Sequence, residues 1–292
     1  MKTDQLPLPV RLLQVSCMAV FLGRAWQHLL WDAPFRTLLW DEGLLKGFVE
    51  STFDVTWFEY VTSPTTDLVI QILIRSTGII YLLGIFATWL VFSKKWEKFS
   101  RFLLLLGSVG LFMLAVLYCK EKYYQLGQLI EYSSQFGAPL LLWWVSKSET
   151  KRVPVTAIKV AIALTFIGHG LYALGYYPLP GHFVDMTINT LGVSEEFAKS
   201  MLFAAGVIDM IVAIGIFIPA IQQPMLLYMV AWGVLTSLAR ITAHIDAQLF
   251  TATLGQWLHE TIYRVPHAVF PMIAFIIIRS IKPKEEVILE NA

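Results

Sequence analysis

Long apolar stretches separated by short polar ones dominate the chain. Runs near the length that a helix needs to cross a bilayer, about 20 residues, occur at 10–31, 67–92, 99–118, 126–146, 155–175, 200–221, 224–244 and 262–280. Glu131 and Gln135 weaken the run at 126, and polar residues open the last one. The pattern predicts an all-α polytopic integral membrane protein with about eight transmembrane helices, six or seven being the alternative counts.

Composition agrees with this pattern. The 292 residues are 57% hydrophobic and only 15% charged, whereas a soluble domain carries about 25% charged residues. The formal net charge of +1 argues against nucleic acid as a partner. Two cysteines, Cys17 and Cys119, form no CxxC pair, which excludes a disulfide framework or a dithiol relay of the usual spacing. The expected partner is the lipid bilayer.

Lysine and arginine placement predicts the orientation, because cytoplasmic loops carry the excess of these residues. With the N-terminus inside, thirteen cations fall on the inner side and five on the outer side. The inner set is Lys2, Arg11, Lys94, Lys95, Lys98, Arg101, Lys147, Lys151, Arg152, Lys159, Arg279, Lys282 and Lys284; the outer set is Arg36, Lys46, Lys120, Lys122 and Lys199. The N- and C-termini are therefore predicted to be cytoplasmic, in the inner membrane of a cell.

Two outer loops are rich in aromatic residues. The longer one, 32–66, contains Trp40-Asp41-Glu42 and Trp57-Phe58-Glu59-Tyr60, and the shorter one spans 176–199. Trp and Tyr favour the headgroup region, so short helices lying in the outer interface are expected. The alternative for 32–66 is a docking surface for a membrane-protein partner.

The two halves of the chain, 1–150 and 151–292, echo each other. Phe21-Leu22-Gly23-Arg24 matches Phe166-Ile167-Gly168-His169, and Leu126-Gly127-Gln128 matches Leu254-Gly255-Gln256. Glu131 and Gln135 then stand opposite Glu260 and Arg264. Four spans in each half would insert both halves in the same direction, so the expected symmetry is a pseudo-two-fold axis along the membrane normal.

Glycines at similar places in the first two spans of each half carry a family resemblance: Gly23, Gly78 and Gly84, then Gly168, Gly206 and Gly215. On these residues the chain resembles two tandem DoxX-like membrane proteins. The resemblance implies four-helix units and, since some members are linked to quinone-coupled sulfur oxidation, a quinone as a cofactor to consider. A weaker resemblance to the membrane region of vitamin-K-carboxylase-like (HTTM) proteins rests on Arg24, Trp31-Asp32 and Asp41-Glu42, and it transfers no catalytic residue.

The stretch 258–271 holds the candidate catalytic residues His259, Glu260, Arg264 and His267. In a helix, Glu260, Arg264 and His267 share one face. An ionised group at mid-membrane costs about 2.5–3.5 kcal/mol on insertion scales, so such residues are expected to be paired, wet or functional. His259 and His267 stand opposite Ile130 and Ala138 in the first half, which makes them the first candidates for chemistry.

Most other costly side chains fall near the outer ends of the spans. The candidate ligand-binding residues are Arg24, His28, Glu131, Gln135, His169, Tyr172, Arg240 and His244. Their alternative role is to hold helices together as ion pairs, Glu260 with Arg240 or Arg264, and Arg24 with Glu131. Arg75 and Asp209 lie deeper.

Five of the six histidines lie in the second half. Imidazoles suit proton relay or a hydrogen bond to a quinone-like carbonyl. Haem or metal is disfavoured, because no His-x-x-x-His or Glu-x-x-His pair occurs. The sequence thus predicts an outer-leaflet pocket for a quinone- or lipid-like molecule, with redox coupling and catalysis left open. The alternatives are an accessory subunit of a larger membrane complex and a proton-coupled transporter.

Overall fold

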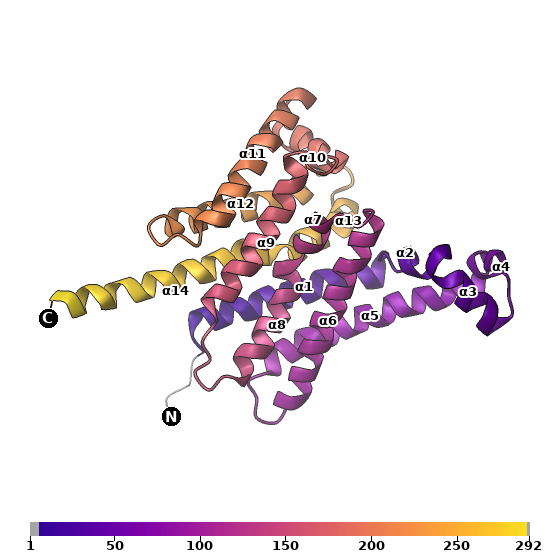
Figure 1. Cartoon of the computed structure of the whole chain (residues 1–292), viewed down its shortest axis with the longest axis horizontal. Coiled ribbons are helices and arrows are strands. Elements are labelled where there is room, and N and C mark those ends of the chain that lie inside the picture. The colour runs from indigo at the N-terminus through magenta and orange to yellow at the C-terminus, as the bar shows by residue number, and fades with distance from the viewer. Residues whose placement is uncertain (1–5, 291–292) are drawn as a thin grey trace.

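The computed structural model describes residues 6–290, with side chains described up to residue 280. Within these residues every regular element is a helix. The first half contains eight of them, which are coloured indigo to magenta in Figure 1. They are α1 (Leu8–Leu30), α2 (Arg36–Leu39), α3 (Glu42–Phe53), α4 (Trp57–Thr62), α5 (Pro64–Leu90), α6 (Glu97–Glu121), α7 (Leu126–Ile130) and α8 (Ser133–Lys147).

The described part of the second half contains six helices, which run from pink through orange to yellow in Figure 1. It consists of α9 (Val155–Ala173), α10 (Gly181–Leu191), α11 (Glu195–Gly215), α12 (Gln222–Thr242), α13 (Phe250–Tyr263) and α14 (Val265–Glu290). Helices α13 and α14 meet at Arg264 and run on as one segment.

Seven helical segments among the described residues are long and apolar enough to cross a membrane. They are α1, α5, α6, α9, α11, α12 and the joined segment Phe250–Ser280. The expected all-α, multi-pass membrane fold is therefore confirmed. The run at 126–146 is not one helix but two, α7 and α8, separated at Glu131 and Tyr132. The last segment begins at Phe250 rather than near residue 262, so the polar stretch 258–271 lies inside it.

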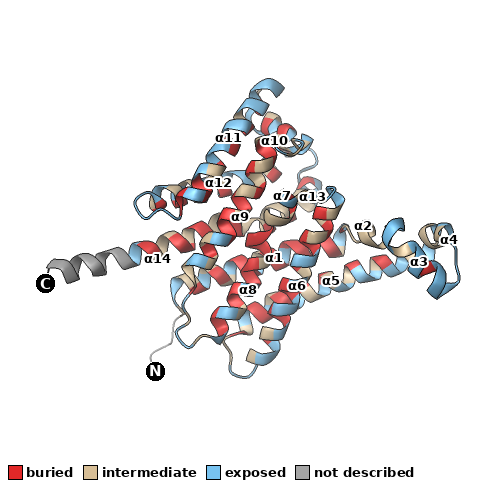
Figure 2. Cartoon of the chain, in the orientation of Figure 1, coloured by how far each residue is buried: buried red, intermediate tan, exposed pale blue. Residues whose placement is uncertain are grey.

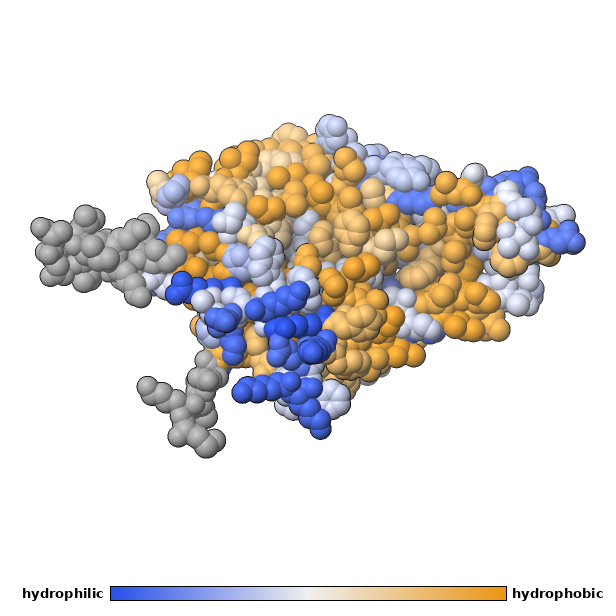
Figure 3. All heavy atoms as spheres, turned by 60° about the horizontal axis from the view of Figure 1, so that its bottom comes forward, coloured by the Kyte–Doolittle hydropathy of each residue, from blue (hydrophilic) through white to orange (hydrophobic). Residues whose placement is uncertain are grey.

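The surface agrees with a bilayer environment. In Figure 3 hydrophobic residues cover most of the visible face, and hydrophilic residues gather mainly at its lower middle and at its right end. Large apolar side chains on the outside of the long helices are more than half exposed, among them Phe86, Trp89 and Ile214. Of the cations used to predict orientation, Lys2 lies outside the described residues, as do the side chains of Lys282 and Lys284.

The loop 32–66 forms the short helices α2, α3 and α4, as expected. Asp41 caps α3 by accepting a hydrogen bond from Leu44 N, and Thr56 with Glu59 forms a capping box on α4. Asp41 also pairs with Lys120 on α6, and this hydrogen bond lowers the pKa of Asp41. Figure 2 shows that α3 and α4 are largely exposed.

The buried core joins the two halves. Figure 2 shows buried residues concentrated on α1, α8 and α9 at the centre of the molecule. Helix α1 packs against α8, α13 and α14, and α9 packs against α7, α8 and α14. Gly23 allows the contact of α1 with α13, since a Cβ there would lie 2.7 Å from the His259 carbonyl oxygen. Gly168 allows the contact of α9 with α7, since a Cβ there would lie 2.7 Å from both Glu131 N and the Gly127 carbonyl oxygen.

Candidate functional site

A cavity of about 310 Å³ lies in the second half, between α9, α10, α11, α12 and α14. Apolar side chains make most of its wall: Phe166, Ala173, Phe183, Met186, Leu191, Met201, Leu202, Ala205, Trp232, Leu235 and Ala239. Its polar lining consists of His169, Thr187, Thr190, Asp209, Thr236, Arg240, Arg264 and His267. A mostly apolar concave site with a few converging polar groups is the usual form of a small-molecule site.

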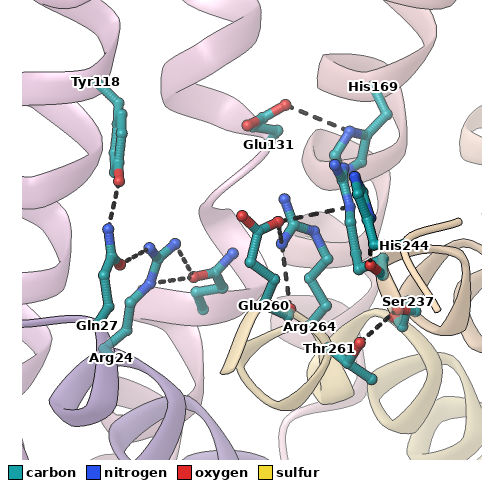
Figure 4. A network of polar contacts seen from close by, with 12 residues as sticks. Arg24, Gln27, Tyr118, Glu131, His169, Ser237, His244, Glu260, Thr261 and Arg264 are labelled. Carbon is teal, nitrogen blue, oxygen red and sulfur yellow. Dashed lines mark hydrogen bonds and ion pairs between the residues drawn. The ribbon is translucent and has the colours of Figure 1, made fainter. Parts of the chain in front are cut away.

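Two histidines of the second half line one side of the cavity, and a glutamate of the first half lies behind them. The rings of His169 on α9 and His267 on α14 lie 5.4 Å apart, edge to face. Glu131 reaches His169 from the break between α7 and α8, with its Oε2 3.3 Å from Nδ1 (Figure 4). The close approach of α7 to Gly168 brings the carboxylate there. His267 Nε2 is buried without a hydrogen-bond partner among the described residues.

Two arginines share one carboxylate at the cavity. Arg264 donates from NH1 to Glu260 Oε2 at 3.3 Å and to the Glu260 carbonyl oxygen at 3.1 Å. Arg240, on α12, places its Nε 3.8 Å from the same Oε2 atom, which is too far for a hydrogen bond. Figure 4 shows Glu260 and Arg264 facing each other. Both of the ion pairs proposed for Glu260 are therefore within 4 Å.

Asp209 lines the cavity from α11. The residue is only 4% exposed, and its Oδ1 has no hydrogen-bond partner among the described side chains. Its Cβ lies against α9, 3.4 Å from where a Cβ on Gly170 would be. Gly170 thus leaves space for the carboxyl group, which a larger residue would restrict. A buried carboxyl oxygen without a partner is costly, so this group is a candidate contact for a bound molecule.

Arg24 lies at the centre of a separate cluster in the first half (Figure 4). It donates to Gln135 Oε1 from Nε at 3.0 Å and from NH2 at 2.6 Å, and to Gln27 Oε1 at 2.6 Å. Its guanidinium carbon also lies 3.6 Å from the ring centre of Tyr263. The expected ion pair of Arg24 with Glu131 is absent among the described contacts, because Glu131 turns toward His169 and Gln128 instead.

Four further predicted site residues lie away from the cavity lining, as Arg24, Gln135, Glu131 and Glu260 do. His28 is buried against Tyr81, with ring centres 5.1 Å apart. His244 stacks on Trp257 at 3.7 Å, and His259 on Trp26 at 6.5 Å. Tyr172 packs against Tyr177 at 5.2 Å. The structure therefore brings together His169, Arg240, Arg264 and His267, with Glu131 and Glu260 behind them, and leaves His259 on the side of α13 that faces α1.

Sequence reasoning missed the part of the cavity that α10 supplies. Phe183, Met186, Thr187 and Thr190 line it from this helix. Their spacing follows one face of a helix. This pattern is visible in the sequence, but for the loop 176–199 it predicts only a short helix in the outer interface. Asp209 was noted as a deep charge, but nothing in the sequence showed which helices would enclose it.

No group of three or more His, Cys, Asp or Glu residues in the described part of the chain is arranged to hold a metal ion. The polar groups at the cavity instead suit hydrogen bonding and charge pairing with an organic molecule. Comparison with known proteins adds no relative: no family model matches the chain, and neither curated proteins nor solved structures give a match.

Proposed function

We propose that this protein binds an amphipathic molecule, quinone- or lipid-like, in the cavity between α9 and α12 of its second half. The observation that carries the proposal is an apolar cavity whose polar lining includes buried atoms without partners, Asp209 Oδ1, Arg240 Nε and His267 Nε2. In an empty site each such atom costs about 1–3 kcal/mol. The polar head of an amphipathic guest would form hydrogen bonds with these atoms, and its apolar body would cover the apolar wall. Whether the guest undergoes redox chemistry is a further step of the same proposal.

We also propose that the two halves are copies of one four-helix unit, as in a tandem DoxX-like protein, with α7 and α8 making the eighth crossing. Equivalent contacts support this. A Cβ on Gly78 would meet Leu29 at 2.8 Å, and a Cβ on Gly206 would meet Leu174 at 2.9 Å. A Cβ on Gly23 would meet Tyr263, and a Cβ on the matching Gly168 would meet Glu131, so Tyr263 and Glu131 occupy equivalent places.

This structural alignment of α7 and α8 with α13 and α14 differs from the sequence alignment by three residues, almost one helical turn. Gln135 then corresponds to His267, where the sequence match had set it against Arg264. Arg24 and His169 each follow one of the matched glycines. Arg24 bonds to Gln135 and His169 lies against His267, so the two pairs of contacts support the shift. On this alignment the first half does have a polar residue at the place of His267.

The same alignment explains why a cavity would persist in the second half and close in the first. Tyr81 occupies the place of Asp209, three residues after the matching glycines. Its ring is fully buried and lies 5.9 Å from that of Phe21. Gly110 makes room for it, since a Cβ there would lie 3.2 Å from the Tyr81 hydroxyl oxygen. The first half thus fills with its own side chains the space that the second half leaves open.

Transplanting that tyrosine tests the proposal. We expect Asp209→Tyr to fill the cavity and to abolish retention of a small molecule, detected by native mass spectrometry of protein purified in mild detergent. Asp209→Asn is the matched control, because it removes the charge but keeps the side-chain volume and a polar group, and it should retain a guest. An Asp209→Tyr protein that is folded and still carries the same guest as the wild type would contradict the proposal.

We keep docking of a membrane-protein partner through 32–66 as a second proposal. Leu44, Phe48, Phe53 and Phe58 on α3 and α4 are each more than half exposed, which suits contact with a protein or with the outer leaflet. Purification in mild detergent distinguishes these. A stoichiometric partner lost on Phe48→Ser supports docking, and a lone chain with or without Phe48 contradicts it.

A further inference from the structure

Arg240 differs from the other buried arginine of the fold in having no hydrogen bond. Among the described residues nothing accepts a hydrogen bond from its guanidinium, and its Nε is fully enclosed. The residue is only 7% exposed. Arg24, which is completely buried, instead has three donors satisfied by Gln27 and Gln135. The chain therefore completes one guanidinium with its own side chains and leaves the other unmatched at the cavity.

At this end of the cavity the two guanidiniums of Arg240 and Arg264 line the wall, while the nearby carboxylates lie behind them and are not part of the lining. Arg240 and Arg264 have one nearby carboxylate in common, Glu260, and it bonds only to Arg264. The other carboxylate of this region, Glu131, lies against His169 and Gln128. A planar guanidinium with free donors matches a carboxylate or phosphate group in both charge and geometry.

The cavity also orients a guest along α12. Arg240 follows Gly233 by two turns of helix, about 10 Å, and both residues line the cavity. Between them the wall is mostly apolar, with Leu235 and Ala239 on α12 and Phe183 on α10, and Thr236 is its polar residue on α12. The ring of Phe183 lies 5.8 Å from the guanidinium carbon of Arg240. A head at Arg240 would thus extend its body past apolar side chains toward Trp232 and Asp209.

We propose that the guest of this cavity is an amphiphile with an oxyanion head, a carboxylate or a phosphate, which Arg240 binds with the help of Arg264. This inference rests on the proposed function and narrows it, because it excludes a neutral quinone as the preferred guest. Glu260 then acts as a partial counter-charge that positions Arg264 and limits how tightly the oxyanion binds.

Binding of labelled palmitate to the purified protein in neutral detergent tests the charge preference. The competitors are unlabelled palmitate, hexadecanol, phosphatidic acid, inorganic phosphate and a neutral benzoquinone with a decyl chain. We expect palmitate or phosphatidic acid to bind at least tenfold more tightly than hexadecanol. The stronger of the two acids identifies the head, and competition by inorganic phosphate alone would identify a free oxyanion as the source.

Three variants at two residues make the test specific. Arg240→Met should remove the preference for acid over alcohol, and Arg240→Lys should keep part of it because the charge remains. Glu260→Gln should strengthen palmitate binding several-fold and leave hexadecanol unchanged, an effect that misfolding cannot produce. Equal binding of palmitate and hexadecanol by the wild type, or an unchanged preference in Arg240→Met, overturns the proposal.

The two proposals fail in different ways. If the benzoquinone binds best, and Asp209→Tyr removes its binding while Arg240→Met does not, the cavity binds an amphiphile but the oxyanion proposal is wrong. If Asp209→Tyr changes the binding of none of these probes, the cavity itself is not the site and the proposed function is wrong.

Discussion

Individual arginines show how one residue type takes opposite roles in this fold. Arg24 is fully buried and its donors are met by Gln27 and Gln135, so it ties α1 to α8. Arg240 is almost as buried but has no hydrogen bond among the described residues. Because a buried polar group without a partner is costly, a structural role explains Arg24 but does not explain Arg240.

Gln135 is the residue at which the structural role of Arg24 can be measured. We expect Gln135→Leu to lower the free energy of unfolding by about 1–3 kcal/mol, the usual cost of leaving a buried donor without its partner. Thermal unfolding of the purified protein in detergent measures this. Gln135→Glu, which supplies a carboxylate in the same place, should keep wild-type stability. Two variants of equal stability would show that Gln135 does not compensate the charge of Arg24.

At the scale of helices, two glycines decide how closely the halves approach. Gly23 lets α1 touch the backbone of α13, and Gly168 lets α9 touch that of α7. The second contact carries Glu131 of the first half to His169, one of the residues that line the cavity. Glycine in a membrane helix commonly serves such close packing.

Alanine at these glycines should separate the helices. A Cβ at position 23 or 168 would lie 2.7 Å from backbone atoms that cannot move aside, so we expect Gly23→Ala and Gly168→Ala to lower the midpoint of thermal unfolding. Gly255→Ala is the control, since a Cβ there meets nothing within 4 Å. It should be neutral, or stabilising by up to about 1 kcal/mol from helix propensity. Equal effects at all three positions would contradict the close-packing explanation.

For the whole molecule, the arrangement in the membrane depends on whether α7 and α8 cross it. Seven segments qualify as spans by length and composition, and seven crossings would place the termini on opposite sides. The lysine and arginine distribution predicts both termini on the cytoplasmic side, which needs an eighth crossing. Helix α8 has 15 residues, about 22 Å at 1.5 Å each, and it packs centrally against α1, α6 and α9.

Reporter fusions on either side of α7 and α8 decide this. We expect a fusion after residue 122 to report the outer side and a fusion after residue 150 to report the cytoplasm, with alkaline phosphatase active only at the first and green fluorescent protein fluorescent only at the second. Fusions after residues 92 and 66 provide the cytoplasmic and outer controls. The same side for 122 and 150 would mean that α7 and α8 do not cross.

The sequence by itself determined the membrane class and most of the helix bounds. In a bilayer a helix satisfies all backbone hydrogen bonds within one apolar run, and α1, α5, α6, α9 and α12 begin and end within three residues of the expected limits, while α11 lies five to six residues earlier. The sequence also identified the polar and charged side chains that are costly to bury in a membrane, because a charge within an apolar run can be recognised without knowing how the helix packs.

Only the tertiary structure decided which of these charges meet. An ion pair of Arg24 with Glu131 was one alternative from the sequence, yet Arg24 bonds to Gln135, and Glu131 reaches His169 on another helix. His259 and His267 looked alike in the sequence, but helix rotation turns the first toward Trp26 and the second into the cavity. Such contacts depend on the distance and rotation of helices far apart in the chain, which hydropathy does not encode. The glycines that set those distances were visible, but not the backbone that each one meets.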